Sequence, residues 1–262
     1  MINFARDNYT TPLPYIISRL ITEYDISKAN ANILLYKNMI SEEEYRTVLS
    51  MDRSHRQIYM GLKQRDEKIS KALKEGFAEF RERFFVSNNL TEADIVSIKK
   101  DAIFVLDKKV NVVDFDNIHF SEKNVYTSYY RIARLEIFYL LDNINEIEKI
   151  DVKGIDDEKL IRHQEYMINF LCIIFEMIQS SSITDVIQYI IQFSEKYKSR
   201  ELPTGYYREF NADSAYRITI NGCNYITDFV SEEESKYLNI SVNYSFIVEL
   251  YKLVTSIYYQ TR

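Results

Sequence analysis

The spacing of apolar residues changes twice within the first 107 residues, and this restricts the folds open to the chain. Residues 15–24 are rich in β-branched and aromatic side chains, which predicts a strand ending at Asp25. Between residues 53 and 86 apolar side chains recur at helical spacing opposite lysines and arginines. Residues 94–107 then form two short apolar runs around a polar triplet, which is typical of a β-hairpin turning at residues 99–101.

The rest of the chain favours an α+β fold with a helical end. Strand-like runs lie at residues 110–120 and 126–132, and helical spacing dominates from about residue 156. Residues 201–229 interrupt it and are predicted to form a loop with one or two strands. We therefore predict a small antiparallel sheet with packed helices in residues 1–150, including a helical segment at about 41–90. Residues 151–262 are predicted to form a mostly helical lobe.

Composition excludes several classes of protein. With 46% hydrophobic and 27% charged residues, the 262-residue chain can bury a sizeable core. Two cysteines cannot build a disulfide framework, no leader pattern opens the sequence, and the most apolar run, 166–178, is shorter than the roughly 20 residues of a membrane helix. We expect a cytoplasmic protein with no membrane partner. The net charge of −6 argues against general coating of nucleic acid but allows a local basic groove.

Common catalytic motifs are absent from the sequence. It contains no glycine-rich phosphate loop, HExxH motif or Ser-His-Asp order, which disfavours hydrolases and dinucleotide oxidoreductases. The histidines at 55, 119 and 163 are far apart and lack spaced ligand partners, so a zinc site is not expected. The aspartates that end the first strand and lie in the hairpin turn, Asp25 and Asp101, are the remaining candidates for chemistry.

The surroundings of these two aspartates resemble the catalytic motifs of DNA polymerase palm domains. Residues 24–34 (YDISKANANIL) are similar to the family A motif D-Y-S-x-x-E-x-R-I-L and, more loosely, to the family B motif D-x-x-S-L-Y-P-S-I. Residues 97–105 (SIKKDAIFV) resemble the family B motif Y-G-D-T-D-S-I-F-V, with Asp101 at the shared aspartate. Residues 118–123 and 151–155 (DVKGI) are similar to the family B stretch that runs from palm to thumb.

The resemblance implies a palm-like domain with reduced fingers at 41–90 and a thumb-like lobe from 151. Asp25 and Asp101 would then be the catalytic residues and the ligands of Mg²⁺ or Mn²⁺ in a two-metal nucleotidyl transfer. Nucleoside triphosphate would lie near Ser27, Lys28, Arg56 and Lys63, and the nucleic-acid primer and template would contact Lys153 and Gly154. The 22 tyrosines and 15 phenylalanines without a tryptophan, together with many Ile, Asn and Lys residues, hint at an AT-rich source such as a phage.

Departures from these motifs leave other functions open. Lys99 replaces the first aspartate of the family B triplet, Ala102 replaces the family A glutamate, and the segment between the aspartates is short for fingers. One alternative is a catalytically degenerate palm that acts as a binding or assembly subunit, with a protein partner on the tyrosine-rich C-terminal lobe. Another is a structural phage protein unrelated to polymerases.

Overall fold

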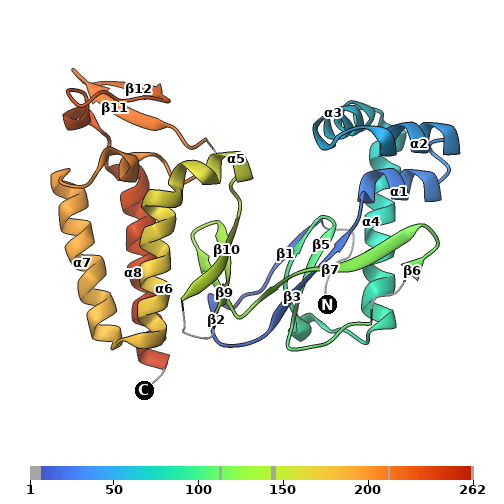
Figure 1. The fold of residues 1–262 in the computed structure, drawn as a ribbon, viewed down its shortest axis with the longest axis horizontal. Helices are drawn as coiled ribbons and strands as arrows, with labels where there is room; N and C mark the ends of the chain where they lie inside the picture. Colours follow the sequence, from blue (N-terminus) through green and yellow to red (C-terminus); the bar gives the residue numbers. More distant parts are fainter. Residues whose placement is uncertain (1–6, 112–113, 143–145, 212, 261–262) are drawn as a thin grey trace. The chain divides into compact units, whose positions relative to one another are not determined.

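The computed structural model describes residues 7–111, 114–142, 146–211 and 213–260. These residues divide into two compact units (Figure 1). The N-terminal unit contains residues up to 12 together with 18–126, and the C-terminal unit contains residues 13–17 and everything from 127. The boundary predicted near residue 150 falls inside a strand of the C-terminal unit.

The N-terminal unit is built on an antiparallel sheet whose described strands run in the order β1-β4-β5-β3-β7-β6. β3 therefore lies between β5 and β7. Asp25 on β3 is thus next to the β4-β5 hairpin, whose turn contains Asp101. The strands are β1 (Asn8–Thr10), β3 (Ile21–Ile26), β4 (Ile95–Lys99), β5 (Ala102–Leu106), β6 (Asp114–Phe115) and β7 (Ile118–Tyr126).

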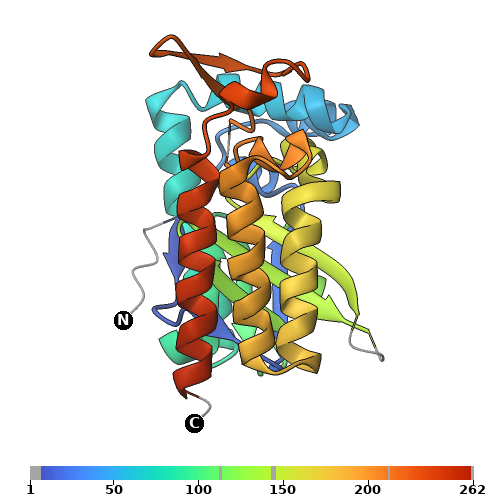
Figure 2. The same ribbon diagram turned by 90° about the vertical axis from the view of Figure 1, so that its left-hand side faces the viewer.

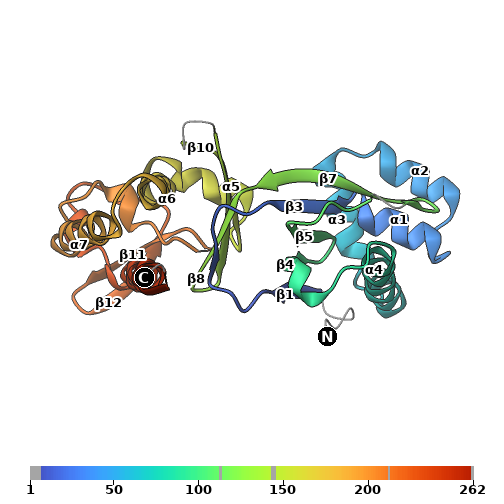
Figure 3. The same ribbon diagram turned by 90° about the horizontal axis from the view of Figure 1, so that it is seen from below.

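Helices cover one face of this sheet (Figure 3). Alternate strand residues such as Tyr24, Ile103 and Phe120 join the core that α4 completes with Phe80 and Phe84. Helix boundaries follow local chemistry, because Asp52 and Asp66 accept backbone N–H groups at the starts of α3 and α4. The helices are α1 (Ala29–Tyr36), α2 (Glu42–Ser50), α3 (Arg53–Lys63) and α4 (Glu67–Ser87), and a 3₁₀ turn at Glu92–Asp94 precedes β4.

The C-terminal unit combines a second antiparallel sheet with three long helices. Its sheet has the order β10-β9-β8-β2, and α6, α7 and α8 lie side by side (Figure 2). A separate hairpin, β11-β12, follows the helix pair α6-α7. The elements are β2 (Tyr15–Ile16), β8 (Ser128–Ile132), β9 (Leu135–Leu141), β10 (Ile147–Lys153), α5 (Asp157–Leu160), α6 (Asn169–Ser180), α7 (Ile183–Ser199), β11 (Tyr216–Ile220), β12 (Cys223–Thr227) and α8 (Ser241–Gln260), with short 3₁₀ or π turns at Ile161–His163, Gln164–Ile168, Thr204–Tyr207 and Ser235–Tyr237.

Antiparallel sheets, packed helices and a largely helical C-terminal part confirm the predicted α+β class. Many tyrosines contribute to the cores. Tyr130 stacks on Phe175 at 4.5 Å between ring centroids, and Tyr139 lies 5.3 Å from the same ring. Both tyrosines are fully buried, so these residues serve packing.

His163 is a buried polar residue within the C-terminal unit. Its Nε2 pairs with the Ser214 hydroxyl at 2.8 Å, and Phe210 meets its ring edge-on. Nδ1 is buried without a hydrogen-bond partner among the described atoms. Burial, assisted by the charges of Arg208 and Arg162, lowers the pKa of His163 to about 4. The folded unit therefore holds a neutral imidazole.

We expect the C-terminal unit to lose stability as the pH falls below about 6.5. Unfolded His163 takes up a proton near that pH, whereas the folded ring resists protonation until about pH 4. The loss between pH 7 and pH 5 should be about 2 kcal/mol for this residue. Urea unfolding at the two pH values measures it. His163→Gln should remove most of this pH dependence, and an unchanged dependence in that variant would contradict the assignment.

Candidate functional site

Asp25 lies on the central strand β3 of the N-terminal sheet, on the face opposite the helix-packed core. The Cα partners of Asp25 are Ala102 on β5 and Ser121 on β7. Because side chains alternate along a strand, Asp25 shares its face with Glu23, while Tyr24 belongs to the core on the other face. The strand predicted at residues 15–24 is interrupted, because Tyr15 and Ile16 form β2, which pairs with β8 in the C-terminal unit. The strand that contains Asp25 is β3, which ends at Ile26, and α1 follows at Ala29.

Asp101 lies in the two-residue turn between β4 and β5, as the hairpin pattern predicted. Lys100 adopts a left-handed conformation with φ 53°, which closes this turn. The carbonyl of Lys100 accepts a hydrogen bond from Nη1 of Arg81 at 2.7 Å, and its N–H donates to the carbonyl of Asp7 at 2.6 Å. Arg81 is only 1% exposed, so α4 holds the turn from inside the protein.

The two carboxylates interact electrostatically. Burial raises the pKa of Asp101, and the negative charge of Asp25 raises it further. Oδ1 of Asp25 is buried and has no hydrogen-bond partner among the described atoms, while Oδ2 pairs with Nζ of Lys123 at 2.9 Å. The charges of Lys100 and Lys123 partly offset these effects on the pKa of Asp101, so what the pair lacks among the described atoms is a partner for Oδ1 of Asp25.

A divalent cation is one candidate ligand for this pair of carboxylates. It would satisfy the orphaned oxygen of Asp25 and offset the repulsion between Asp25 and Asp101, and Mg²⁺ and Mn²⁺ favour carboxylate oxygens. Within the part of the chain that the structure describes, no three His, Cys, Asp or Glu side chains converge on one point. A cation at the pair would therefore complete its coordination with water or substrate oxygens.

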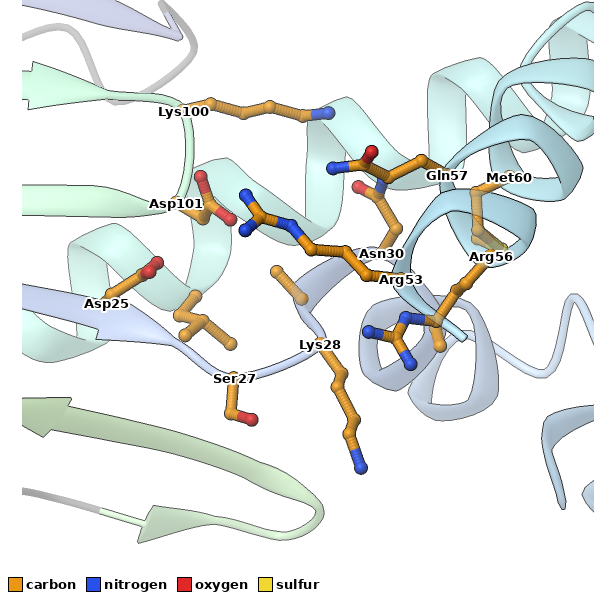
Figure 4. Close-up of a pocket in the computed structure, with 13 residues that line it drawn as sticks. Asp25, Ser27, Lys28, Asn30, Arg53, Arg56, Gln57, Met60, Lys100 and Asp101 are labelled. Atoms are coloured by element: carbon orange, nitrogen blue, oxygen red, sulfur yellow. The ribbon is translucent and has the colours of Figure 1, made fainter. Parts of the chain in front are cut away.

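A pocket of about 280 Å³ opens beside the pair (Figure 4). Asp25 and Asp101 line one end, and the guanidinium of Arg53 extends toward Asp101. Arg53 and Arg56 come from one face of α3, which Gln57 and Met60 continue at helical spacing. The full lining is Asp25, Ile26, Ser27, Lys28, Ala29, Asn30, Ala31, Arg53, Arg56, Gln57, Met60, Lys100 and Asp101.

Asn30 adds an unsatisfied polar atom to the same lining. Its Oδ1 is buried and lacks a hydrogen-bond partner among the described atoms. A buried acceptor without a donor costs free energy, and a ligand hydroxyl or amine in the pocket would offset that cost. Two orphaned oxygens, on Asn30 and Asp25, therefore belong to one pocket.

The structure brings most of the predicted site residues together. Ser27, Lys28 and Arg56 line the pocket with the two aspartates, although the Lys28 side chain points away from the pair in Figure 4. Lys63 is outside this lining and forms an ion pair with Glu44. The predicted role of these residues in nucleotide binding stays a prediction.

Lys153 and Gly154 belong to the other unit, at the end of β10. The Lys153 ammonium pairs with Asp151 at 2.7 Å, and Gly154 has a φ of 109°, which favours glycine. They form the turn from the second sheet toward α5. Their predicted role in contacting nucleic acid stays a prediction.

Sequence reasoning missed the roles of Lys123 and Arg81. Lys123 is the cation that pairs with Asp25, whereas Nζ of Lys99, which replaces an aspartate of the family B motif, donates to Thr10 on the edge strand β1 at 3.4 Å. Lys123 reaches Asp25 from β7, which pairs with β3 across a long sequence separation. Side-chain alternation within one strand does not predict a contact between residues far apart in the sequence. For Arg81, the one available signal was its position among the phenylalanines of α4.

Taken together, fold and pocket define an α+β protein with a paired-carboxylate site walled by arginine and lysine. The family model described as Bacteriophage PBS1 gene 130 protein matches residues 2–256, so the chain belongs to this phage protein family. The match supports the phage source that composition suggested. A comparison with curated proteins gives no match. In the described part of the chain, every helix is too short or too polar to span a membrane.

Proposed function

We propose that the pocket binds a nucleoside triphosphate with Mg²⁺ or Mn²⁺ and that the protein transfers the nucleotide to a nucleic-acid primer. The observation that carries the proposal is the division of charge within one pocket. Two carboxylates occupy one end, and Arg53, Arg56 and Lys100 come from the elements around it. Metal-bound polyphosphate has the complementary pattern, because its cation prefers carboxylates and its oxygens prefer guanidinium groups.

Each residue has a distinct part in the proposed reaction. Asp25 and Asp101 would hold the metal ions, which supply charge neutralisation at the phosphorus under attack. Arg53 and Arg56 would bind the non-transferred phosphates and orient the triphosphate along the pocket. Arg81 would position the Asp101 turn without touching substrate. The resemblance of residues 24–34 and 97–105 to palm motifs supports the same assignment.

Primer extension tests the proposal. Wild-type protein should extend a labelled primer on a template with Mg²⁺ or Mn²⁺ and all four nucleotides, in deoxyribose and ribose forms. Asp25→Ala and Asp101→Ala should each abolish the product. Extension that survives both substitutions would place the chemistry elsewhere or in a contaminant.

A second function is favoured by one specific observation. Lys123 already neutralises Asp25 at 2.9 Å, and an internal cation of this kind is what a degenerate site would contain. In that case the protein would bind without catalysis, and the C-terminal unit would supply the protein partner. Nucleotide binding that is independent of metal, with no extension under any condition above, would select this alternative.

Arginine in the pocket should matter more for nucleotide affinity than arginine elsewhere on the same segment. We expect Arg56→Met to weaken binding of a fluorescent nucleoside triphosphate with Mn²⁺ about tenfold, since one charge-assisted hydrogen bond to phosphate is lost. Fluorescence anisotropy measures the change. Arg65→Met is the matched control, because exposed Arg65 lies outside the pocket lining. Equal losses in the two variants would indicate a diffuse charge effect.

A further inference from the structure

The strand next to Asp25 contains a local irregularity at Lys123. The Cα partner of Glu23 is Asn124, whereas the partner of Tyr24 is Glu122, so β7 has one extra residue at this point. That residue is Lys123, the extra position of a β-bulge. A bulge redirects the side chain of its extra residue, and here the ammonium reaches the face that bears Glu23 and Asp25.

Lys123 lies between two carboxylates that differ in environment. Its Nζ is 2.9 Å from Oδ2 of Asp25 and 3.6 Å from Oε1 of Glu23. Glu23 is 1% exposed, and its carboxylate also accepts hydrogen bonds from Asn124 at 2.5 Å and from the Tyr126 hydroxyl at 3.3 Å. These donors and its place 3.6 Å from Nζ make the Glu23 carboxylate a second acceptor within reach of the ammonium.

The ammonium has room to change between these positions. The Lys123 side chain is 50% exposed, and its flexible stem reaches both carboxylates from the bulge without a change of backbone. Moving fully to Glu23 would release Oδ2 of Asp25 while leaving no buried carboxylate without a cation. Without Glu23, an ammonium that left Asp25 would have no second carboxylate on β3 with which to pair.

We propose that Lys123 is a positioning residue that holds Asp25 in the metal-free protein and transfers to Glu23 when a divalent cation binds. The inference rests on the proposed metal-dependent function of Asp25 and Asp101. Lys123 then acts as an internal competitor of the metal, and Glu23 is the acceptor that makes the exchange possible. A cation arriving alone has to displace the ammonium, which keeps the site weakly loaded until additional ligands arrive with the substrate.

Mn²⁺ binding to the full chain, without nucleotide, tests the exchange and needs no catalytic activity. Free Mn²⁺ is followed by electron paramagnetic resonance. Lys123→Met removes the charge but keeps most of the stem, and we expect it to bind Mn²⁺ about tenfold more tightly than wild type. Glu23→Gln keeps the shape, and we expect weaker binding because Lys123 then stays on Asp25. Asp25→Asn in each background should abolish the site.

The double variant separates exchange from general charge effects. If Lys123 transfers to Glu23, then Glu23→Gln weakens Mn²⁺ binding more in the wild-type background than in the Lys123→Met background. Additive effects would overturn the proposal, as would a Lys123→Met protein that binds Mn²⁺ no more tightly than wild type. Circular dichroism checks folding, and Lys123→Gln replaces Lys123→Met if the latter unfolds.

Failure of the exchange and failure of nucleotidyl transfer give different results. Absence of primer extension together with tighter Mn²⁺ binding by Lys123→Met and a non-additive effect of Glu23→Gln would reject the transfer reaction and retain the exchange. Primer extension that depends on Asp25 and Asp101, together with equal Mn²⁺ affinity of wild type and Lys123→Met, would retain the reaction and reject the exchange.

Discussion

Asp101→Asn should lower the rate of nucleotidyl transfer by roughly a thousandfold or more. The substitution keeps the size of the side chain in the turn after Lys100 but removes the negative charge proposed to hold the metal. Asp101 is partly buried beside Asp25, and one carboxylate alone is a much weaker divalent-cation site than two. Single-nucleotide incorporation under saturating primer and nucleotide measures the rate.

The control for this experiment is Asp116→Asn. Asp116 is an exposed residue with φ 52° at the turn between β6 and β7, and asparagine tolerates that conformation. Its substitution should leave the rate within about twofold of wild type. A similar loss in both variants would point to general damage of the protein. A rate that Asp101→Asn leaves intact would contradict the assigned role of Asp101.

Arg81→Leu should destabilise the N-terminal unit by about 2–4 kcal/mol. The guanidinium is almost fully buried, donates to the Lys100 carbonyl, and lies 3.3 Å from the carboxylate of Asp7. Leucine fills much of the space but leaves the buried carbonyl without its donor. Urea unfolding followed by circular dichroism measures the loss, and transfer should fall as well because the Asp101 turn loses its support.

Arg83→Leu is the matched control on the same helix. Arg83 is 40% exposed and pairs with Glu79 within one turn of α4, so its loss should cost at most about 1 kcal/mol. An Arg81→Leu protein as stable as Arg83→Leu would show that the buried guanidinium does not hold the turn. If the two variants are equally stable but only Arg81→Leu loses transfer activity, Arg81 supports the site without contributing to the stability of the unit.

Local patterns predicted much of the N-terminal unit. The strand that contains Asp25 was predicted only in part, because the start expected at residue 15 belongs to β2 in the other unit. The hairpin with its turn at residues 99–101 was visible because apolar runs and turn polarity are properties of short segments. The helical stretch predicted at residues 53–86 followed from apolar spacing, and the structure divides it into α3 and α4, whose first turns are capped by Asp52 and Asp66. Apolar spacing and alternation depend on neighbours in sequence, which is why local patterns reveal these elements.

Long-range pairing was the part that local patterns could not supply. Strand β9 at Leu135–Leu141 and strand β10 at Ile147–Lys153 were not predicted, and together they move the division between units to residue 126. Their apolar runs are short and compatible with either helix or strand. The second sheet forms because β8 pairs with both β9 and the distant β2.

The candidate site shows the same limit. Arg53 and Arg56 were recognisable as cations on one helix face, yet only the fold shows that this face lines the pocket of Asp25 and Asp101. Lys63, on the same helix, instead pairs with Glu44. The contact between Lys123 and Asp25 depends on a bulge in β7, and a one-residue irregularity in strand pairing leaves no mark in the sequence.

The central claim is that Asp25 and Asp101 hold a divalent cation that carries a nucleoside triphosphate in the adjacent pocket. A crystal structure with Mn²⁺ and a non-hydrolysable nucleoside triphosphate tests it most directly, because anomalous scattering locates the manganese. We predict a manganese peak bound by both carboxylates, with phosphate oxygens toward Arg53 and Arg56. A bound triphosphate elsewhere, or a pocket with nucleotide but no manganese at the two carboxylates, would contradict the account.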